Sequence, residues 1–360
     1  MSGKKKALIA MSGGVDSSVA AWLMQREGYD CIGAMMKLWD SGPEDAGGRT
    51  CCSEEDARDA RSVAARIGIP FYIFNFKEEF EGSVVRPFAE SYIRGETPNP
   101  CIDCNRCMKF GRLMERMREI GCSCLATGHY ARISYDPELG LYRLRKAADA
   151  SKDQSYVLCG LTQEELAQVR FPLGEYTKAQ IRAVAQEQGF RNARKRDSQD
   201  ICFVPDGDYG TFIEGYCGEK FPPGDFISED GKVLGQHRGM IRYTVGQRRG
   251  LGIAAEQRLY VLRKEPEENR IVLGPKERLY RRTLEADRCS FIREPEGETF
   301  RCSAKIRYRH REAPAEAVRL SDTEVRVVFD EPQAGITPGQ TVAFYDGDEV
   351  LGGGRIRESL

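Results

Sequence analysis

The feature that most constrains this chain is residues 7–18, where an apolar run ends in a glycine pair and a helix pattern follows. Val19, Trp22 and Leu23 recur at the i, i+3, i+4 spacing of an amphipathic helix. A strand, a tight turn and a helix in this order direct backbone N–H groups and the positive end of the helix dipole at one point. The stretch therefore predicts an anion-binding loop at the end of a first strand.

Hydroxyl groups surround this loop, because Ser12, Ser17 and Ser18 flank the glycines. The plain alternative is an ordinary strand–helix turn with a serine N-cap. No Gly-Lys-Ser/Thr follows, so the loop is not the common phosphate loop of NTPases. The motif SGGVDSS instead resembles the pyrophosphate loop (PP-loop) of the ATP pyrophosphatase superfamily. Members of that superfamily cleave ATP between the α and β phosphates and adenylate a carbonyl-type oxygen.

Composition and length indicate a globular protein of several domains. The 360 residues are 41% hydrophobic and 30% charged, and a chain of this length exceeds one ordinary core. No apolar run approaches the length of a membrane span, and no signal-peptide core follows the N-terminus. We therefore expect a cytoplasmic protein with no membrane partner. Because the net charge is −1, any nucleic acid must bind through local basic patches.

Strand and helix patterns alternate through the first half of the chain. Strand patterns occupy residues 7–11, 31–38, 71–76 and 124–127, and helix patterns occupy residues 17–26, 54–67, 105–120, 162–169 and 177–188. This alternation predicts an α/β fold with a doubly wound, mostly parallel sheet, whose ligands bind beyond the carboxyl ends of the strands. Ser53 and Asp56 form a capping-box pattern before the second helix. A short strand at residues 201–204 is expected to close this domain.

Turn-forming residues predict two further domains. After Pro205, prolines and glycines break any long helix, which predicts a small, mainly β central domain. Short alternating runs between turns follow, which predicts a C-terminal β-barrel. We expect a catalytic domain at residues 1–206, a central domain at 207–276 and the barrel at 277–360.

A basic stripe is predicted on the barrel. Lys305, Arg307, Arg309 and Arg311 alternate along an expected strand at residues 301–310, so they would share one face. Such a stripe suits RNA phosphates, and the alternative is an ordinary solvated face.

The chain has 13 cysteines, an odd number. In a cytoplasmic protein this argues against a disulfide framework and for catalytic or metal-binding thiols. Cys101, Cys104 and Cys107 share overlapping C-x-x-C spacing after a Thr-Pro-Asn-Pro loop. Asn105 is expected to cap the next helix, which would place Cys104 near a helix N-terminus that favours a thiolate.

Cys202 is the second candidate thiol, because the strand expected at residues 201–204 would end at the same crevice as the glycine loop. For all these thiols the alternative is a small buried hydrophobic side chain. Cys51, Cys52 and Cys107 have no context that assigns them a role.

Taken together, the motifs resemble the bacterial tRNA-specific 2-thiouridylases over essentially the whole chain. They are SGGVDSS, TPNP-x-x-x-C-N, ATGHY, SKDQSY, ICF after DSQD, TVGQRRGLGI, RYR, TPGQ and a terminal LGGG. In that family, ATP adenylates O2 of the wobble uridine in tRNAs for Lys, Glu and Gln, and persulfide sulfur displaces AMP to give 2-thiouridine. The resemblance implies ATP and Mg²⁺ as cofactors, tRNA as substrate, and a cysteine desulfurase or sulfur-relay protein as sulfur donor. We expect a monomer.

The resemblance also implies roles for individual residues. Cys104 matches the nucleophilic cysteine and Cys202 the persulfide-bearing one, and the two form a disulfide bond after sulfur transfer. The matched ATP-binding positions are Ala10, Met11, Ser12, Gly13, Gly14, Val15, Asp16, Ser17, Met36 and Gly128. The loop that meets the target base is matched by Asn99, Pro100 and Cys101. The matched tRNA contacts are His129, Lys152, Asp153, Gln154, Arg307, Tyr308 and Gln340.

Two residues of this set leave their chemistry open. Asp16 is either a metal-binding or a loop-organising carboxylate. Cys101 stands where better-known members of the family have an Asp that acts as an acid or base on the target base. A thiol cannot simply take over that role. Cys101, Cys104 and Cys202 are instead candidates to hold three irons of a [4Fe–4S] cluster. Persulfide and cluster chemistry both stay open, and zinc is the weaker third choice because no fourth ligand is evident.

Two other functions compete with tRNA thiolation. A small-molecule adenylating synthetase of the same superfamily would explain the glycine loop but not the cysteine pair or the basic barrel. A non-catalytic tRNA-binding protein would explain the barrel but not an intact SGGVDS.

Overall fold

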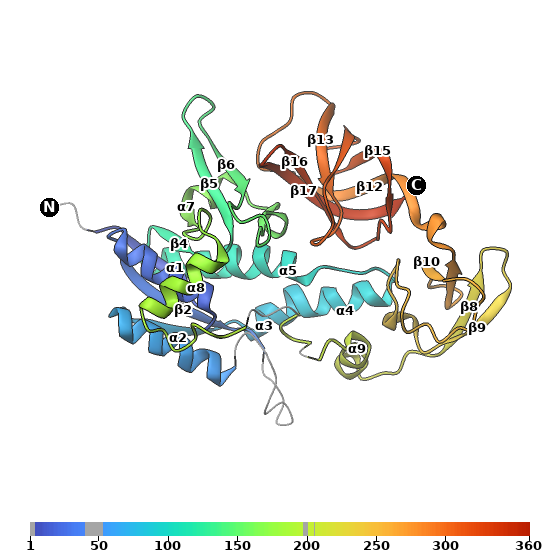
Figure 1. The fold of residues 1–360 in the computed structure, drawn as a ribbon, viewed down its shortest axis with the longest axis horizontal. Helices are drawn as coiled ribbons and strands as arrows, with labels where there is room; N and C mark the ends of the chain where they lie inside the picture. The colour runs from blue at the N-terminus through green and yellow to red at the C-terminus, as the bar shows by residue number, and fades with distance from the viewer. Residues whose placement is uncertain (1–3, 40–52, 197–200, 205) are drawn as a thin grey trace. The chain divides into compact units, whose positions relative to one another are not determined.

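The computed structural model describes residues 4–39, 53–196, 201–204 and 206–360. The chain divides into two compact units, whose elements are drawn in Figure 1. The first unit comprises Met1–Val84, Cys101–Gly207 and Asp348–Leu351, and the second comprises Val85–Pro100, Asp208–Gly347 and Gly352–Leu360. Among the described residues, no helix is long and apolar enough to cross a membrane.

A five-stranded parallel sheet forms the centre of the first unit, in the order β3-β2-β1-β4-β7. The strands are β1 (Lys6–Ala10), β2 (Asp30–Lys37), β3 (Phe71–Asn75), β4 (Cys124–Ala126) and β7 (Val169–Arg170). On β1, Ala7 and Ile9 belong to one core cluster, and Leu8, which points to the opposite face, is also 0% exposed. Both faces of the sheet are therefore covered, which confirms the doubly wound α/β fold.

Three helices bury their apolar sides in the cluster that contains Ala7 and Ile9. They are α1 (Val15–Arg26), α2 (Glu54–Ile67) and α8 (Lys178–Glu187). The capping box at α2 is confirmed: the Ser53 side chain accepts from the Asp56 N–H at 3.1 Å, and the Asp56 carboxylate accepts from the Ser53 N–H. Local side-chain chemistry thus fixes where this helix begins.

Shorter elements complete the first unit. They are α3 (Lys77–Phe80), α5 (Pro100–Asp103), the π-type helix η2 (Cys104–Arg112), α6 (Leu113–Glu119), β5 (Ala131–Asp136), β6 (Leu141–Lys146), the 3-10 helix η3 (Ser155–Leu158) and α7 (Gln163–Gln168). A further π-type helix, η1 (Glu81–Val85), joins α3 to α4 (Arg86–Ile93), which belongs to the second unit.

Two sequence predictions for the first unit are wrong. Residues 201–204 form a turn rather than a strand, closed by the Val204 N–H on the Ile201 carbonyl at 2.9 Å. Asn105 does not cap a helix, because the helical segment already begins at Pro100, and Asn105 instead donates its side-chain amide to the Val157 carbonyl at 3.0 Å. Proline suits a first helical position, since its missing N–H would have no helical partner there.

In the second unit, a four-stranded sheet of order β10-β11-β8-β9 builds the region predicted as the central domain. Its strands are β8 (Gly224–Ser228), β9 (Val233–His237), β10 (Tyr260–Glu265) and β11 (Arg270–Gly274). The helix α9 (Tyr209–Cys217) precedes the sheet and was not predicted. Two short 3-10 helices, η4 (Met240–Arg242) and η5 (Lys276–Leu279), also belong to this unit. Because both predicted β domains lie in one unit, the boundary between them stays a prediction.

An antiparallel barrel forms the C-terminal part of the second unit, as predicted. Its strands run in the order β12-β15-β14-β13-β16-β17, and the pairing of β12 with β17 completes the circle. They are β12 (Tyr280–Phe291), β13 (Thr299–Lys305), β14 (Ala313–Arg319), β15 (Val325–Ala334), β16 (Thr341–Asp346) and β17 (Glu349–Ser359). On β17, Glu349 and Val350 pair with β6 and belong to the first unit.

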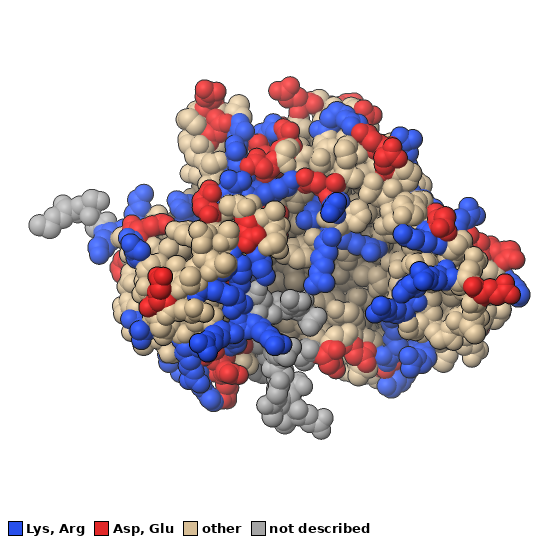
Figure 2. Space-filling model, in the orientation of Figure 1, with Lys and Arg blue, Asp and Glu red and all other residues tan. Residues whose placement is uncertain are grey.

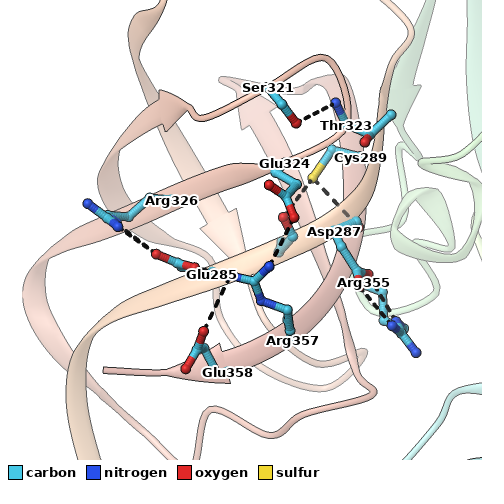
Figure 3. Close-up of polar contacts among 11 residues, drawn as sticks. Glu285, Asp287, Cys289, Ser321, Thr323, Glu324, Arg326, Arg355, Arg357 and Glu358 are labelled. Atoms are coloured by element: carbon cyan, nitrogen blue, oxygen red, sulfur yellow. Dashed lines mark hydrogen bonds and ion pairs between the residues drawn. The ribbon is translucent and has the colours of Figure 1, made fainter.

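The predicted basic stripe on the barrel is wrong. Strand β13 ends at Lys305, and the chain then turns, with the His310 N–H on the Arg307 carbonyl at 3.0 Å. Arg307, Arg309 and Arg311 therefore do not alternate along a strand. Other arginines of the barrel form ion pairs with carboxylates of the barrel. Figure 3 shows Glu285 of β12 between Arg326 and Arg357, which both donate to its carboxylate.

Candidate nucleotide and sulfur-transfer site

The glycine loop lies at the carboxyl end of β1, where the sequence predicted it. Gly13 adopts a φ of +77°, which side-chain-bearing residues rarely adopt. A Cβ at Gly13 would lie 2.4 Å from the Asp56 carbonyl oxygen. The loop therefore packs directly on the first turn of α2, and only glycine fits there.

Serine side chains hold the loop in one conformation. Ser17 Oγ accepts from the Ser12 N–H at 3.1 Å and donates to the Gly14 carbonyl at 3.1 Å. Ser18 Oγ donates to the same carbonyl at 2.9 Å. Ser17 and Ser18 thus both bind the Gly14 carbonyl, and Ser17 also holds the Ser12 N–H.

Asp16 lies in the first turn of α1 and is paired with a lysine. Lys178 Nζ lies 2.7 Å from each carboxylate oxygen, and the Tyr130 hydroxyl donates to Oδ1 at 2.8 Å. This arrangement favours the loop-organising role for Asp16 over the metal-binding one. Sequence reasoning missed Lys178 and Tyr130, because no motif spacing links them to the loop.

Gly128 and His129 follow β4 and lie beside the loop. A Cβ at Gly128 would come within 2.8 Å of the Ser17 nitrogen, so this position also needs glycine. His129 is 7% exposed; its Nδ1 lies 2.7 Å from Thr127 Oγ1 and its Nε2 lies 3.4 Å from Lys109 Nζ. Burial, and to a lesser degree the Lys109 charge, hold the pKa of His129 well below its usual value, so the ring is neutral.

Asp153 and Gln154 shape the turn beside His129. The Asp153 carboxylate accepts from the Ala147 N–H at 2.9 Å and from the Ser155 hydroxyl at 2.7 Å. Gln154 Oε1 accepts from the Tyr130 N–H at 2.9 Å. Lys152 on the same turn is half-buried. The structure thus brings together four of the predicted tRNA contacts, and their contact with RNA stays a prediction.

The candidate thiols are more exposed than most of the other described cysteines, although Cys107 and Cys217 are half-buried as well. Cys101 on α5 is exposed, and Cys104 and Cys202 are half-buried. By contrast, burial raises the pKa of Cys159 and Cys302 to about 12, which makes these two thiols poor nucleophiles. Cys51 and Cys52 lie outside the described residues. Phe203, next to Cys202, packs on Phe80 and Trp39 with ring centroids 5.6 and 6.4 Å apart, which anchors the turn.

The cluster hypothesis does not fit the arrangement of ligands. Within residues 4–39, 53–196, 201–204 and 206–360, no three His, Cys, Asp or Glu side chains are grouped as a metal ion requires. Cys101, Cys104 and Cys202 all lie in this part of the chain, so their predicted three-iron arrangement is not supported.

The remaining predicted site residues lie as follows. Met36 is on β2, beside the first strand, and is half-buried. In the second unit, Asn99 precedes α5 and Tyr308 is 40% exposed. Arg307 donates to the carbonyls of Val245 and Gly335, so part of its guanidinium holds the fold together.

Charge is mixed on one face of the molecule. On the face drawn in Figure 2, Lys and Arg side chains lie among Asp and Glu side chains, in keeping with the net charge of −1.

The parallel sheet and the glycine loop at its carboxyl edge define a nucleotide-binding α/β protein. Family models match almost the whole chain. They are the tRNA methyl transferase HUP domain at residues 5–206, the tRNA methyl transferase PRC-barrel domain at 210–275, and the aminomethyltransferase beta-barrel domain at 281–356.

The chain belongs to the family of tRNA-specific 2-thiouridylases, MnmA. It is 49% identical to the protein of that name from Acetivibrio thermocellus, over 98% of this chain and 99% of the relative. It is 47% identical to the MnmA of Carboxydothermus hydrogenoformans, over 99% of each chain. It is 49% identical to the MnmA of Geobacter metallireducens, over 99% of this chain and 98% of the relative.

Proposed function

We propose that this protein is a tRNA-uridine 2-sulfurtransferase, which converts the wobble uridine of tRNAs for Lys, Glu and Gln into 2-thiouridine at the expense of ATP. The observation that carries the proposal is the 49% identity to a tRNA-specific 2-thiouridylase over 98% of the chain, with the glycine loop intact. The protein acts in the cytoplasm as a monomer.

The first step activates the base. Uridine O2 is a poor leaving group, so it attacks the α-phosphorus of ATP, the bond to the β-phosphate breaks, and pyrophosphate leaves. Loop N–H groups and the N-terminus of α1 stabilise the negative charge that develops on the departing phosphates. Mg²⁺ bound to ATP would supply further positive charge to the departing phosphates. Asp16, the carboxylate of the glycine loop, is already paired with Lys178. The Mg²⁺ ion would therefore be held by the phosphates of ATP and by water.

The second step transfers sulfur. Cys202 carries a persulfide, received from a donor protein of the cysteine desulfurase or sulfur-relay class. Its terminal sulfur attacks C2 of the adenylated uridine, the C2–O2 bond breaks, and AMP leaves with O2. The Cys104 thiolate then attacks the Cys202 sulfur, which releases 2-thiouridine and forms a Cys104–Cys202 disulfide. A thiol reductant restores both cysteines.

The route of sulfur is tested by anaerobic preparation of the protein. We expect no stoichiometric iron or acid-labile sulfide, and we expect Cys101→Ala to retain thiolation. Iron and sulfide in cluster stoichiometry, together with loss of thiolation in Cys101→Ala, would replace the persulfide route by a cluster.

The substrate is tested by measuring AMP and pyrophosphate release with purified tRNA. Release is expected with a tRNA that has uridine at the wobble position and not with one that has guanosine there. Release that depends on a small metabolite and ignores tRNA would establish the adenylating-synthetase alternative. Binding of tRNA without any ATP cleavage would establish the non-catalytic alternative.

A further inference from the structure

Asn192 contacts the glycine loop from a distant part of the sequence. Its side chain is 3% exposed, and Nδ2 donates to the Gly13 carbonyl at 2.8 Å and to Ser18 Oγ at 2.9 Å. Gly13 lies 179 residues earlier in the chain. Both hydrogens of the Asn192 amide are therefore used on the loop.

This contact fixes the orientation of a peptide group. In a trans peptide the C=O and the following N–H point in opposite directions. Because the Gly13 carbonyl is directed at Asn192, the Gly14 N–H points to the opposite side. In the same way, the Ser17 and Ser18 hydroxyls bind the Gly14 carbonyl and turn the Val15 N–H away from themselves. Two successive N–H groups are thus presented at the N-terminus of α1.

The peptide between Gly13 and Gly14 joins two glycines. Neither glycine has a Cβ, so little steric resistance opposes a flip of this peptide. A flipped peptide would direct the Gly13 carbonyl oxygen, rather than the Gly14 N–H, toward the phosphates of ATP. It would also break the bond from Asn192 Nδ2 to the Gly13 carbonyl and leave one buried N–H of Asn192 without that partner, which opposes the flip.

The segment that carries Asn192 is itself fastened to α2. Lys195 Nζ lies 2.7 Å from Asp56 Oδ1 and 2.8 Å from Asp59 Oδ2, and Arg191 lies 3.7 Å from Asp59. The Asp56 backbone is also the surface on which Gly13 packs. Asn192 is therefore held at a fixed distance from the loop by the helix that supports the loop.

We propose that Asn192 is a positioning residue that holds the Gly13–Gly14 peptide in its anion-binding orientation, and so sets the affinity for ATP. This inference rests on the proposed function only in that ATP is the ligand; it does not depend on which acceptor is adenylated.

The test is ATP titration of the full chain without tRNA, so its outcome is independent of whether thiolation occurs. Asn192→Ala is expected to raise the Kd for ATP about tenfold. The matched control is Gln163→Ala, which loses two amide–backbone bonds to Tyr142, each 2.8 Å long, in the same unit but away from the loop. The control is expected to bind ATP like the wild type.

Asn192→Asp separates positioning from simple loss of stability. A protonated carboxyl donates to the Gly13 carbonyl, whereas a carboxylate repels it. ATP affinity of Asn192→Asp should therefore rise relative to Asn192→Ala as the pH falls through the range in which the carboxyl protonates. Wild-type affinity in Asn192→Ala, or parallel pH profiles for the two variants, would overturn the proposal. If Asn192→Ala does not fold, the pH profile of Asn192→Asp against the wild type decides.

Discussion

Gln340 donates its side-chain amide to the carbonyl of Thr97 at 2.7 Å and so joins a barrel turn to the loop before α5. The Thr97 N–H in turn donates to the Pro338 carbonyl at 2.9 Å, and a Cβ at Gly339 would lie 2.9 Å from the Thr97 nitrogen. Gln340, which the resemblance assigned to tRNA contact, therefore also holds the loop that contains Asn99 and Pro100.

Removing this hydrogen bond should loosen the target-base loop. Gln340→Ala is expected to lower the rate of tRNA thiolation several-fold, because the loop would sample conformations that do not meet the base, while the Kd for ATP stays the same. Hydrogen exchange of the peptide containing Thr97 should become faster in the variant. Unchanged exchange at Thr97 would show that Gln340 acts on RNA alone.

The pair between Asp16 and Lys178 predicts a stability effect. The two side chains are 29% and 11% exposed, so Lys178→Met leaves a largely buried carboxylate without its cation. We expect the free energy of unfolding to fall by about 1–3 kcal/mol. Tyr130→Phe, which removes one neutral donor to the same carboxylate, should cost about 1 kcal/mol. Urea denaturation measures both, and equal stabilities of Lys178→Met and wild type would contradict the structural role.

His129 predicts a pH dependence of stability. Its pKa in the folded state lies well below that of the unfolded chain, about 6.5, because the ring is buried. The unfolded state therefore binds a proton below about pH 6.5 when the folded state does not, and the free energy of unfolding falls as the pH falls below that value.

His129→Gln should reduce this slope by up to about 1.4 kcal/mol per pH unit, while His237 and His310, whose pKa values are also lowered by burial, continue to contribute. Urea titrations at several pH values between 5 and 7 would measure the difference. The same slope in variant and wild type would show that His129 accepts a proton in the folded protein.

Lys264 is a second buried group with a predicted pH response. Its Nζ has no hydrogen-bond partner among the described residues and lies 5.7 Å from the centre of the Tyr92 ring. Burial lowers the pKa of Lys264 to about 7, against an opposing effect of Glu96. At pH 7 and below, the folded state bears the cost of a buried charge. As the pH rises above 7 the folded state loses this proton first, so the stability of the wild type increases.

Lys264→Met should therefore be more stable than the wild type by on the order of 2 kcal/mol at pH 6. The difference should shrink as the pH rises from 7 toward 10. Melting temperatures of the two proteins across this range provide the measurement, and a difference independent of pH would mean that the ammonium is solvated.

Features that depend on neighbouring residues could be predicted from the sequence. The Ser53 capping box, the glycine loop and the alternation of strands and helices are set by contacts within a few residues, and the structure confirms them. The strand predicted at residues 201–204 was wrong because a four-residue apolar run suits a buried turn equally well. The two-residue strand β7 is too short to produce any periodic pattern.

Features that depend on distant partners could not be predicted. Tyr130, Lys178 and Asn192 contact the glycine loop from 114 to 179 residues away. Each has an ordinary local context, so its role follows only from the folded arrangement. The basic stripe predicted after Lys305 was wrong for a similar reason. Strand β13 ends where its pairing with β14 and β16 ends.

The central claim is that the glycine loop and two cysteines together thiolate tRNA. The most direct measurement is mass analysis of tRNA nucleosides from cells that lack their own 2-thiouridylase and express this chain. We predict 2-thiouridine at the wobble position with the wild type and Cys107→Ser, and none with Cys104→Ser or Cys202→Ser. Absence of 2-thiouridine with the wild type, or its persistence in Cys104→Ser and Cys202→Ser, would contradict the account.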